Sequence, residues 1–262
     1  MQNEIKNDKK SHPYGQLIRK KLKLRDRLIL SLDVSDKSEA IKILRAADNK
    51  ISTIKIGLEL IYSQGLQIIN TVKKSGYKVM LDAKLMDIPN TVAGAVKGIS
   101  KLGVEMITIH TFGGDCMLKS AVNALNEVCI KKNNIRPLFF GVTVLTSLDD
   151  FDLAEFGYSL KFSELVLKMA RIAIDCKIDG IICSPNEVKI LRENFGENFL
   201  IATPGIRLVE DDIGDQKRVN TPQKAIRDGA DFIIAGRSIT SSSDVGKKIN
   251  SYLEKIEREL KG

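Results

Sequence analysis

The chain has 262 residues, of which 43% are hydrophobic, and its formal net charge is +8 at pH 7. This length and apolar content suit one large α/β domain and exclude a disordered or collagen-like chain. No apolar stretch approaches the roughly twenty residues of a membrane span, and the lysine-rich N-terminus lacks the apolar core of a signal peptide. We therefore expect a cytoplasmic protein with no membrane partner.

The cysteine and charge patterns offer little for a metal site or a nucleic-acid site. The four cysteines show no CxxC spacing and there are only two histidines, so we expect buried or incidental thiols and no metal. The basic segment 19–27 (RKKLKLRDR) is the best support for nucleic-acid binding, but no zinc-finger, RNP or helix-turn-helix pattern accompanies it. We expect a solvated surface and no nucleic-acid partner, with residues 1–26 forming an N-terminal arm or helix.

Short β-rich runs alternate with amphipathic helical patterns from residue 27 nearly to the end of the chain. Strands are expected at 28–32, 53–56, 78–81, 105–109, 138–144, 180–183, 199–202 and 232–235. Helices are expected at 37–47, 60–75, 90–102, 114–130, 163–176, 186–194, 222–228 and 245–260. This alternation predicts a TIM (β/α)8 barrel as a single domain over 27–262, preceded by a short N-terminal extension. The alternative is a doubly wound sheet, but no GxGxxG fingerprint follows the first strand.

Polar residues recur at the carboxyl ends of the predicted strands, which is where barrel enzymes place their active sites. In chain order they are Asp33, Lys55, Asp82, Lys84, His110, Thr111, Thr143, Thr146, Ser147, Ser184, Arg207 and Arg237. Alternation along a strand puts Asp82 and Lys84 on one face. Lys55 lies inside its strand and needs a partner if that face is buried, and Asp33 or Asp82 could supply it. A structural alternative is an exposed ion pair, with Asp87 capping the helix that follows.

Arginine and glycine occur together after each of the last two strands. Arg207 follows Gly205, and Arg237 follows Gly236. Barrels often bind phosphate at this point, through loop amides and a basic side chain. Glycine permits close backbone approach to an anion and arginine is a bidentate donor, so we expect a phosphorylated substrate.

The run 82–91 (DAKLMDIPNT) resembles the DxKxxDIPNT signature of the orotidine 5'-phosphate decarboxylase family. Further similarities extend from about residue 27 to 240, at 32–33, 55–57, 144–147, 203–207, 215–219 and 235–237. The resemblance implies a carboxy-lyase without metal or cofactor that converts orotidine 5'-phosphate to UMP and carbon dioxide, the last step of de novo pyrimidine nucleotide synthesis.

The resemblance also implies roles for individual residues. An alternating array of Lys55, Asp82, Lys84 and Asp87 would surround the scissile carboxylate, with Lys84 as the proton donor. Asp33 and Lys55 would touch the ribose hydroxyls, and Thr146 and Ser147 the pyrimidine. Gln216 would bridge base and phosphate, and Gly236, Arg237 and Arg207 would hold the phosphate.

Asp87 and Thr91 would, by the same resemblance, reach the neighbouring subunit's site, so a homodimer with shared active sites is expected. The loop 209–219 is a candidate lid. Three alternatives remain open: a magnesium-dependent sugar-phosphate decarboxylase or aldolase on the same scaffold, a nucleotide-binding protein without catalysis, and a nucleic-acid role for the basic N-terminal segment.

Overall fold

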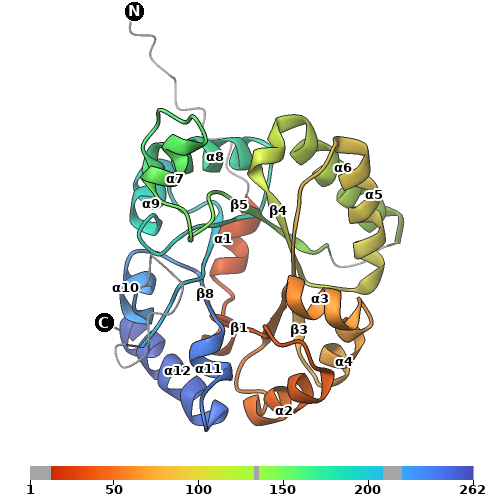
Figure 1. Ribbon diagram of the computed structural model, residues 1–262, viewed down its shortest axis with the longest axis vertical. Helices are drawn as coiled ribbons and strands as arrows, with labels where there is room; N and C mark the ends of the chain where they lie inside the picture. Colours follow the sequence, from red (N-terminus) through yellow and green to blue (C-terminus); the bar gives the residue numbers. More distant parts are fainter. Residues whose placement is uncertain (1–12, 133–135, 209–219, 262) are drawn as a thin grey trace, which may run out of the picture.

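The structure is a computed structural model that describes residues 13–132, 136–208 and 220–261. In these ranges, eight parallel strands form a closed barrel (Figure 1). In barrel order the strands are β1 (Leu28–Ser31), β2 (Thr53–Ile56), β3 (Lys78–Leu85), β4 (Met106–His110), β5 (Leu138–Val142), β6 (Gly180–Ile182), β7 (Leu200–Thr203) and β8 (Phe232–Ala235). Each strand pairs in parallel with the next, and β1 pairs with β8. The predicted TIM barrel is confirmed.

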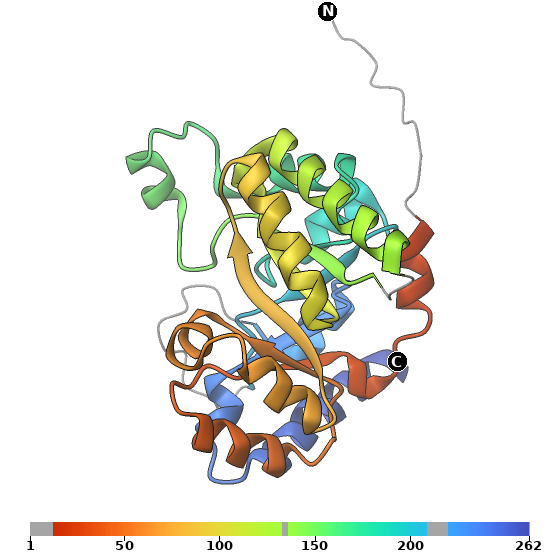
Figure 2. The same cartoon turned by 90° about the vertical axis from the view of Figure 1, so that its right-hand side faces the viewer.

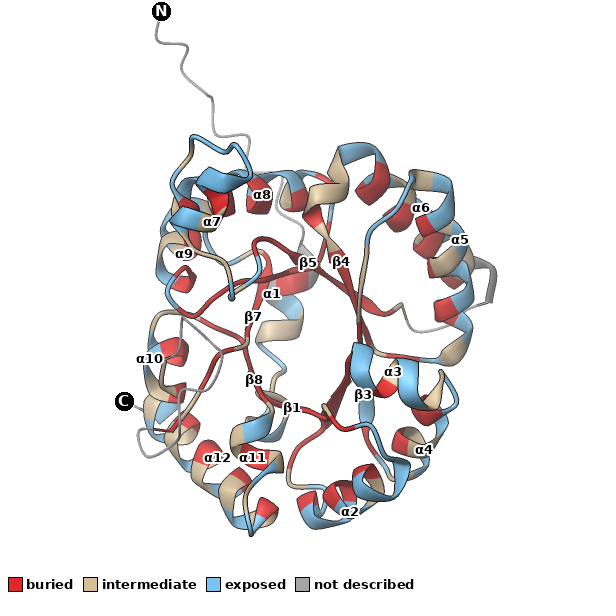
Figure 3. Cartoon of the chain, in the orientation of Figure 1, coloured by how far each residue is buried: buried red, intermediate tan, exposed pale blue. Residues whose placement is uncertain are grey.

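Helices connect the strands and cover the outside of the barrel. They are α1 (Pro13–Arg19), α2 (Lys37–Ala47), α3 (Leu58–Gln64), α4 (Ile68–Lys74), α5 (Pro89–Ile99), α6 (Gly114–Lys132), α7 (Asp150–Glu155), α8 (Phe162–Asp175), α9 (Val188–Phe195), α10 (Pro222–Arg227), α11 (Arg237–Thr240) and α12 (Val245–Lys261). Figure 3 shows buried positions on the helix faces that pack on the strands and exposed positions on the outer faces. Among the helices of the described ranges, none combines the length and apolarity needed to span a bilayer.

The sequence explains these elements locally. Strands such as β1 and β2 are buried along their whole length, as expected for parallel strands covered on both faces. Helix α2 begins after Asp36, whose carboxylate accepts hydrogen bonds from the backbone N–H groups of Ser38 and Glu39. Its buried positions, Ala40, Ile43, Leu44 and Ala47, recur at helical spacing.

Some elements differ from the sequence-based expectation. The helix expected over 60–75 is divided into α3 and α4, because Gly65 adopts a left-handed φ of 67° that ends the first helix. Strand β3 continues to Leu85 rather than ending at residue 81. The short helices α7 and α11, which lie in loops after β5 and β8, were not expected from the sequence.

A layer of apolar side chains fills the barrel interior. It consists of Ile29, Met80, Met106, Leu138, Phe140, Val142, Ile182, Leu200, Ala202, Phe232 and Ile234. Ile18 of α1 and Leu22 pack against this layer, so α1 covers the N-terminal end of the barrel. In Figure 2 it lies at the end opposite α7. The division of the chain into an N-terminal arm or helix over 1–26 and a barrel domain over 27–262 stays a prediction.

At the N-terminal end of the barrel, acidic side chains just before alternate strands accept hydrogen bonds from the backbone of the preceding strand. Glu105 accepts a hydrogen bond from the backbone N–H of Val79, Asp179 from that of Phe139, and Asp231 from that of Ile201. Arginines neutralise the two buried aspartates: Arg136 contacts Asp179 at 2.7 Å, and Arg192 contacts Asp231 at 2.7 Å. Arg19 of α1 joins Asp231 at 2.9 Å. The arginine partners of Asp179 and Asp231 explain the burial of these two carboxylates without any catalytic role.

Candidate active site

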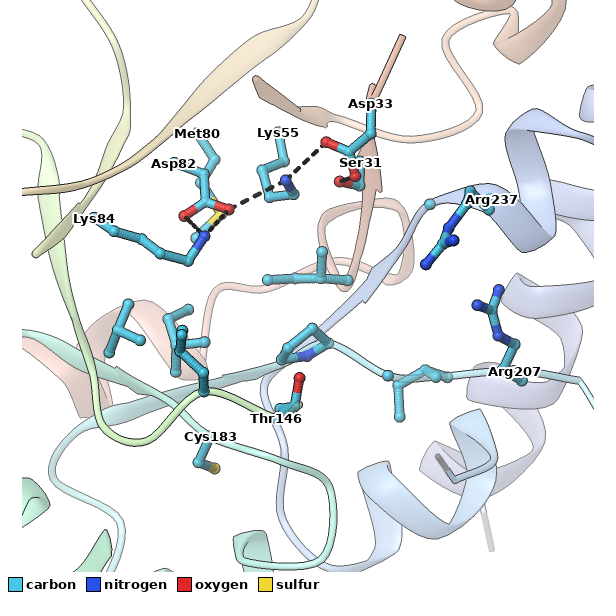
Figure 4. Close-up of a pocket in the computed structure, with 18 of the residues that line it drawn as sticks. Ser31, Asp33, Lys55, Met80, Asp82, Lys84, Thr146, Cys183, Arg207 and Arg237 are labelled. Carbon is cyan, nitrogen blue, oxygen red and sulfur yellow. Dashed lines mark hydrogen bonds and ion pairs between the residues drawn. The ribbon is translucent and has the colours of Figure 1, made fainter. Parts of the chain in front are cut away.

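A cavity of about 230 Å³ opens at the carboxyl ends of the strands (Figure 4). Its charged and polar lining is Ser31, Asp33, Lys55, Asp82, Lys84, Thr146, Cys183, Arg207 and Arg237, with Gly205 and Gly236. Apolar side chains complete the wall, among them Met80, Val142 and Ile234 of the interior layer. Seven of the twelve polar residues that the sequence placed at strand ends meet in this pocket, as barrel geometry predicts. The other five, His110, Thr111, Thr143, Ser147 and Ser184, do not line it.

Four charged side chains, from strands β2 and β3 and the loop after β1, form a continuous row along one side of this pocket. Lys55 Nζ lies 3.1 Å from Asp33 Oδ1 and 3.1 Å from Asp82 Oδ2. Lys84 Nζ lies 3.0 Å from both carboxylate oxygens of Asp82. Figure 4 shows the resulting order Asp33, Lys55, Asp82, Lys84. The expected pairing of Lys55 with the two aspartates is present.

Burial and pairing act against each other in this chain of charges. Burial raises the pKa of the Asp82 carboxyl group, but the ammonium groups of Lys55 and Lys84 lower it more, so the net pKa lies below its ordinary value. Burial lowers the pKa of Lys55, but Asp82 and Asp33 raise it more, so the net pKa lies above its ordinary value. The inner charges are thus held in their ionised forms.

Strand β3 has a backbone irregularity at Lys84, where it lines the pocket. The register between β3 and β4 shifts after the pair Leu81–Ile107, and it resumes at Leu85–Ile109. Lys84, inside this bulge, has a φ of 47°, in the left-handed region that lysine rarely adopts. Non-glycine residues in this conformation cost about 1–3 kcal/mol and cluster at functional sites. Asp82 and Lys84 both line the pocket, as alternation along a strand predicts, although the bulge lies between the paired positions on either side of them.

Two glycines make room for the charged side chains. A Cβ at Gly57, directly after β2, would lie 2.9 Å from both Asp33 Oδ1 and Lys55 Nζ. A Cβ at Gly236, after β8, would lie 3.2 Å from Ser31 Cβ and 3.5 Å from Asp33 Oδ2. A larger residue at position 57 would therefore push Asp33 and Lys55 apart and break their ion pair.

The two predicted phosphate-binding arginines lie at the other end of the pocket. Figure 4 shows the guanidinium groups of Arg207 and Arg237 on the same side of the cavity, away from Lys84 and Asp82. The Nε of Arg207 is buried and has no hydrogen-bond partner within the described ranges. Thr146 lines the pocket between the side that carries the two arginines and the side that carries Lys84 and Asp82.

Other predicted site residues are not in this pocket. Asp87 and Thr91 are exposed on the loop after β3 and the start of α5, and Asp87 accepts a hydrogen bond from the backbone N–H of Ile88 at 2.6 Å. Ser147 is also exposed and does not line the cavity. Gln216 and the expected lid 209–219 lie outside the described residues. The roles of all these residues stay predictions.

The structure adds residues that the sequence reasoning did not select. Ser31 donates a hydrogen bond of 2.6 Å to Asp33 Oδ2, and Thr108 donates one of 2.9 Å to Asp82 Oδ1. Both occupy inward positions that alternation along β1 and β4 could have indicated. Burial lowers the pKa of His110, at the end of β4, and the Lys84 charge lowers it further. Within the described ranges, no group of three or more His, Cys, Asp or Glu side chains is placed to hold a metal ion.

Comparisons with known proteins agree with the fold and identify the family. Residues 26–252 match the model of the Orotidine 5'-phosphate decarboxylase / HUMPS family. A relative named orotidine 5'-phosphate decarboxylase, from Carboxydothermus hydrogenoformans, is 42% identical over 237 residues, which is 90% of this chain and 98% of the relative. One of the same name from Coxiella burnetii is 40% identical over 235 residues, covering 90% of this chain and 97% of the relative.

Solved structures extend the similarity to three dimensions. A crystal structure of orotidine 5'-phosphate decarboxylase from Lactobacillus acidophilus has a TM-score of 0.76 and 36% identity, covering 88% of this chain and 99% of the other. The resemblance inferred from the DAKLMDIPNT run and the expectation of a carboxy-lyase are confirmed. With a family match over most of its length and relatives at about 40% identity that it covers almost entirely, the chain belongs to the Orotidine 5'-phosphate decarboxylase / HUMPS family.

Proposed function

We propose that this chain decarboxylates orotidine 5'-phosphate to UMP and carbon dioxide, the last step of de novo pyrimidine nucleotide synthesis, with Lys84 as the proton donor. The observation that carries this proposal is the pocket itself. It holds a chain of alternating carboxylates and ammonium groups on one side and two arginines at the far end. A substrate with a phosphate and a reacting carboxylate at opposite ends matches this distribution of charge.

The chemistry follows from the position of Lys84. Breaking the bond between the ring carbon and the carboxylate releases carbon dioxide and leaves the bonding electron pair on that carbon. A nearby ammonium stabilises this negative charge and then donates its proton to the carbon. Lys84 Nζ is suited to both tasks because Asp82 holds it by both oxygens at 3.0 Å, so no reorganisation is needed as the charge develops.

The carboxylate of Asp82 has a second effect. It is largely buried next to the position proposed for the substrate carboxylate, and repulsion between the two would favour departure of carbon dioxide. Lys55 limits this repulsion because it shares Asp82 with Lys84. The position of Lys55 between Asp33 and Asp82 also leaves it able to bond a ribose hydroxyl together with Asp33.

The remaining contacts are proposed from position in the pocket and from family membership. Arg237 and Arg207, with the Gly236 amide, would bind the phosphate. Thr146, with Ser147, would contact the pyrimidine, and Gln216 would bridge base and phosphate. Binding energy from the phosphate end would orient the ring against Lys84, since binding energy from remote contacts can lower the barrier to breaking the reacting bond.

We further propose that the active species is a cytoplasmic homodimer in which Asp87 and Thr91 complete the partner's site. Asp87 is exposed between two large apolar side chains, Met86 and Ile88, which are 56% and 67% exposed. Apolar side chains so exposed around a charged residue are typical of an interaction surface. This arrangement supports a contact that buries Met86 and Ile88 and brings Asp87 to a neighbouring Lys84.

Ultraviolet absorbance of orotidine 5'-phosphate, followed with purified protein in excess chelator, tests the function. The wild type should convert the substrate to UMP, and a folded Lys84→Ala variant should not. Conversion of another sugar phosphate only after magnesium is added would instead indicate a metal-dependent enzyme on the same scaffold. Tight UMP binding without turnover by the wild type would indicate a nucleotide-binding protein.

A further inference from the structure

We propose that Thr108 is a positioning residue, whose hydroxyl holds the Asp82 carboxylate and the Lys84 backbone in the arrangement that the reaction requires. The inference rests on the proposed function for its kinetic consequences and on contacts within the barrel for its geometry. Thr108 lies in the middle of β4 and is only 1% exposed. It does not line the pocket, so it acts through its two neighbours on β3.

The contacts of Thr108 join two features of the site. Its Oγ1 donates a hydrogen bond to Asp82 Oδ1 and accepts one from the Lys84 backbone N–H, both at 2.9 Å. A hydroxyl has one donor and two acceptor positions, so it can make both bonds together. The same Asp82 oxygen also accepts from Lys84 Nζ. One side chain therefore contacts the backbone of the proton donor and the carboxylate that orients it.

The bulge in β3 explains why a side chain is needed here. Between the paired positions Leu81–Ile107 and Leu85–Ile109, three residues of β3 lie opposite Thr108 alone. In a regular parallel ladder the Lys84 N–H would bond a backbone carbonyl of the next strand. Here it bonds the Thr108 hydroxyl instead, and Lys84 has the left-handed φ of 47°. The threonine thus satisfies the amide that the irregular backbone leaves without a ladder partner.

Removing the hydroxyl with little change of shape tests the proposal. We expect Thr108→Val to lower kcat by about 10- to 100-fold, because Lys84 and Asp82 lose a fixed position, and to leave KM within about twofold. Thr108→Ser keeps the hydroxyl and should stay within about threefold of the wild-type kcat. Thr53→Val makes the same chemical change at a buried threonine near the N-terminal end of β2 and is the matched control. If Thr108→Val does not fold, Thr108→Ala carries the same expectation.

The pH profile gives a second readout. The charged and polar groups facing Asp82 are Lys55 from β2, Lys84 from β3 and Thr108 from β4. The Thr108 hydrogen bond favours the ionised carboxylate, so its loss raises the pKa of Asp82. The acid limb of kcat/KM should therefore move to higher pH in Thr108→Val and stay in place in Thr108→Ser.

Amide hydrogen exchange at Lys84 separates this proposal from the proposed function, because it needs no turnover. Exchange should be at least about fivefold faster in Thr108→Val than in the wild type. Faster exchange in Thr108→Val, combined with a wild type that does not convert orotidine 5'-phosphate, would refute the function and retain the structural role of Thr108. Wild-type kcat in Thr108→Val, or an equal loss in Thr108→Ser, would overturn the positioning role.

Discussion

Replacing Lys55 by methionine tests whether the chain of charges stabilises the fold. Methionine keeps most of the length of the side chain and removes the ammonium that bridges Asp33 and Asp82. The Asp33 side chain is 40% exposed, so solvent screening limits that pair to about 0–1 kcal/mol. The Lys55 and Asp82 side chains are 11% and 10% exposed, and breaking a buried pair costs about 3–5 kcal/mol.

The remaining partner of Asp82 reduces the expected loss. Lys84 still holds both carboxylate oxygens, so we expect Lys55→Met to lower the free energy of unfolding by about 2–3 kcal/mol at pH 7. Urea denaturation should show a lower midpoint with an unchanged m-value. Asp33→Asn removes only the screened pair and is the control, with an expected loss of at most about 1 kcal/mol.

The ion pair between Lys55 and Asp82 also predicts how the stability gained from these charges depends on pH. The pKa of Lys55 is raised, so its contribution is complete below about pH 10.4 and is lost as the pH rises through the folded-state value. The pKa of Asp82 is lowered, so its contribution is complete above about pH 3.9 and is lost as the pH falls through the folded-state value. The difference between wild type and Lys55→Met should be constant between these limits. A variant as stable as the wild type would refute the reasoning and would mean that the array is maintained at the expense of stability.

Three further predictions concern other parts of the molecule. Mixing inactive Lys84→Ala and Asp87→Ala chains should restore up to about a quarter of the sites after random exchange, because each heterodimer has one intact site; no recovery despite verified exchange would place Asp87 in its own subunit's site. Arg237→Ala should reduce kcat/KM for orotidine 5'-phosphate by about 10- to 100-fold and leave that for orotidine unchanged; an equal loss for both substrates would contradict a phosphate contact. Arg19→Ala removes the 2.9 Å contact with buried Asp231 and should lower stability by about 1–3 kcal/mol without changing kcat, as urea denaturation and turnover assays would show; a change in kcat would contradict the separation of the two barrel ends.

The sequence predicted the barrel and one side of its site for a common physical reason. Parallel strands are buried on both faces and appear as short apolar runs, so β1 and β2 could be located to within about a residue. The carboxyl ends of such strands meet at one end of the barrel. Asp33, Lys55, Asp82 and Lys84 could therefore be placed together from the sequence.

Features that depend on backbone irregularity were not predicted. The bulge in β3 and the left-handed φ of Lys84 arise from pairing with β4, and neither leaves a pattern in the 78–85 segment alone. The roles of Thr108 and Ser31 follow from those contacts and were missed with them. Gly65 is a sequence signal that could have divided the helix expected over 60–75, since glycine often ends helices.

The proposed role of Asp87 could not be derived from strand patterns, for a different reason. Its side chain is exposed in the single chain, and its proposed role requires a second subunit. Position along one sequence carries no information about contacts across a two-fold axis. The DAKLMDIPNT resemblance supplied that expectation, and the exposed Met86 and Ile88 are the physical observation that supports it.

The position of α1 has a practical consequence for handling the protein. The helix covers the N-terminal end of the barrel, and the pocket opens at the carboxyl ends of the strands. A resin or sensor surface joined through a spacer ahead of Pro13 would hold each molecule by the end away from its pocket. The substrate would then reach the mouth of the cavity from free solution. Coupling through the loop that carries Ile88 would instead place the support beside that mouth and obstruct both substrate entry and the proposed subunit contact.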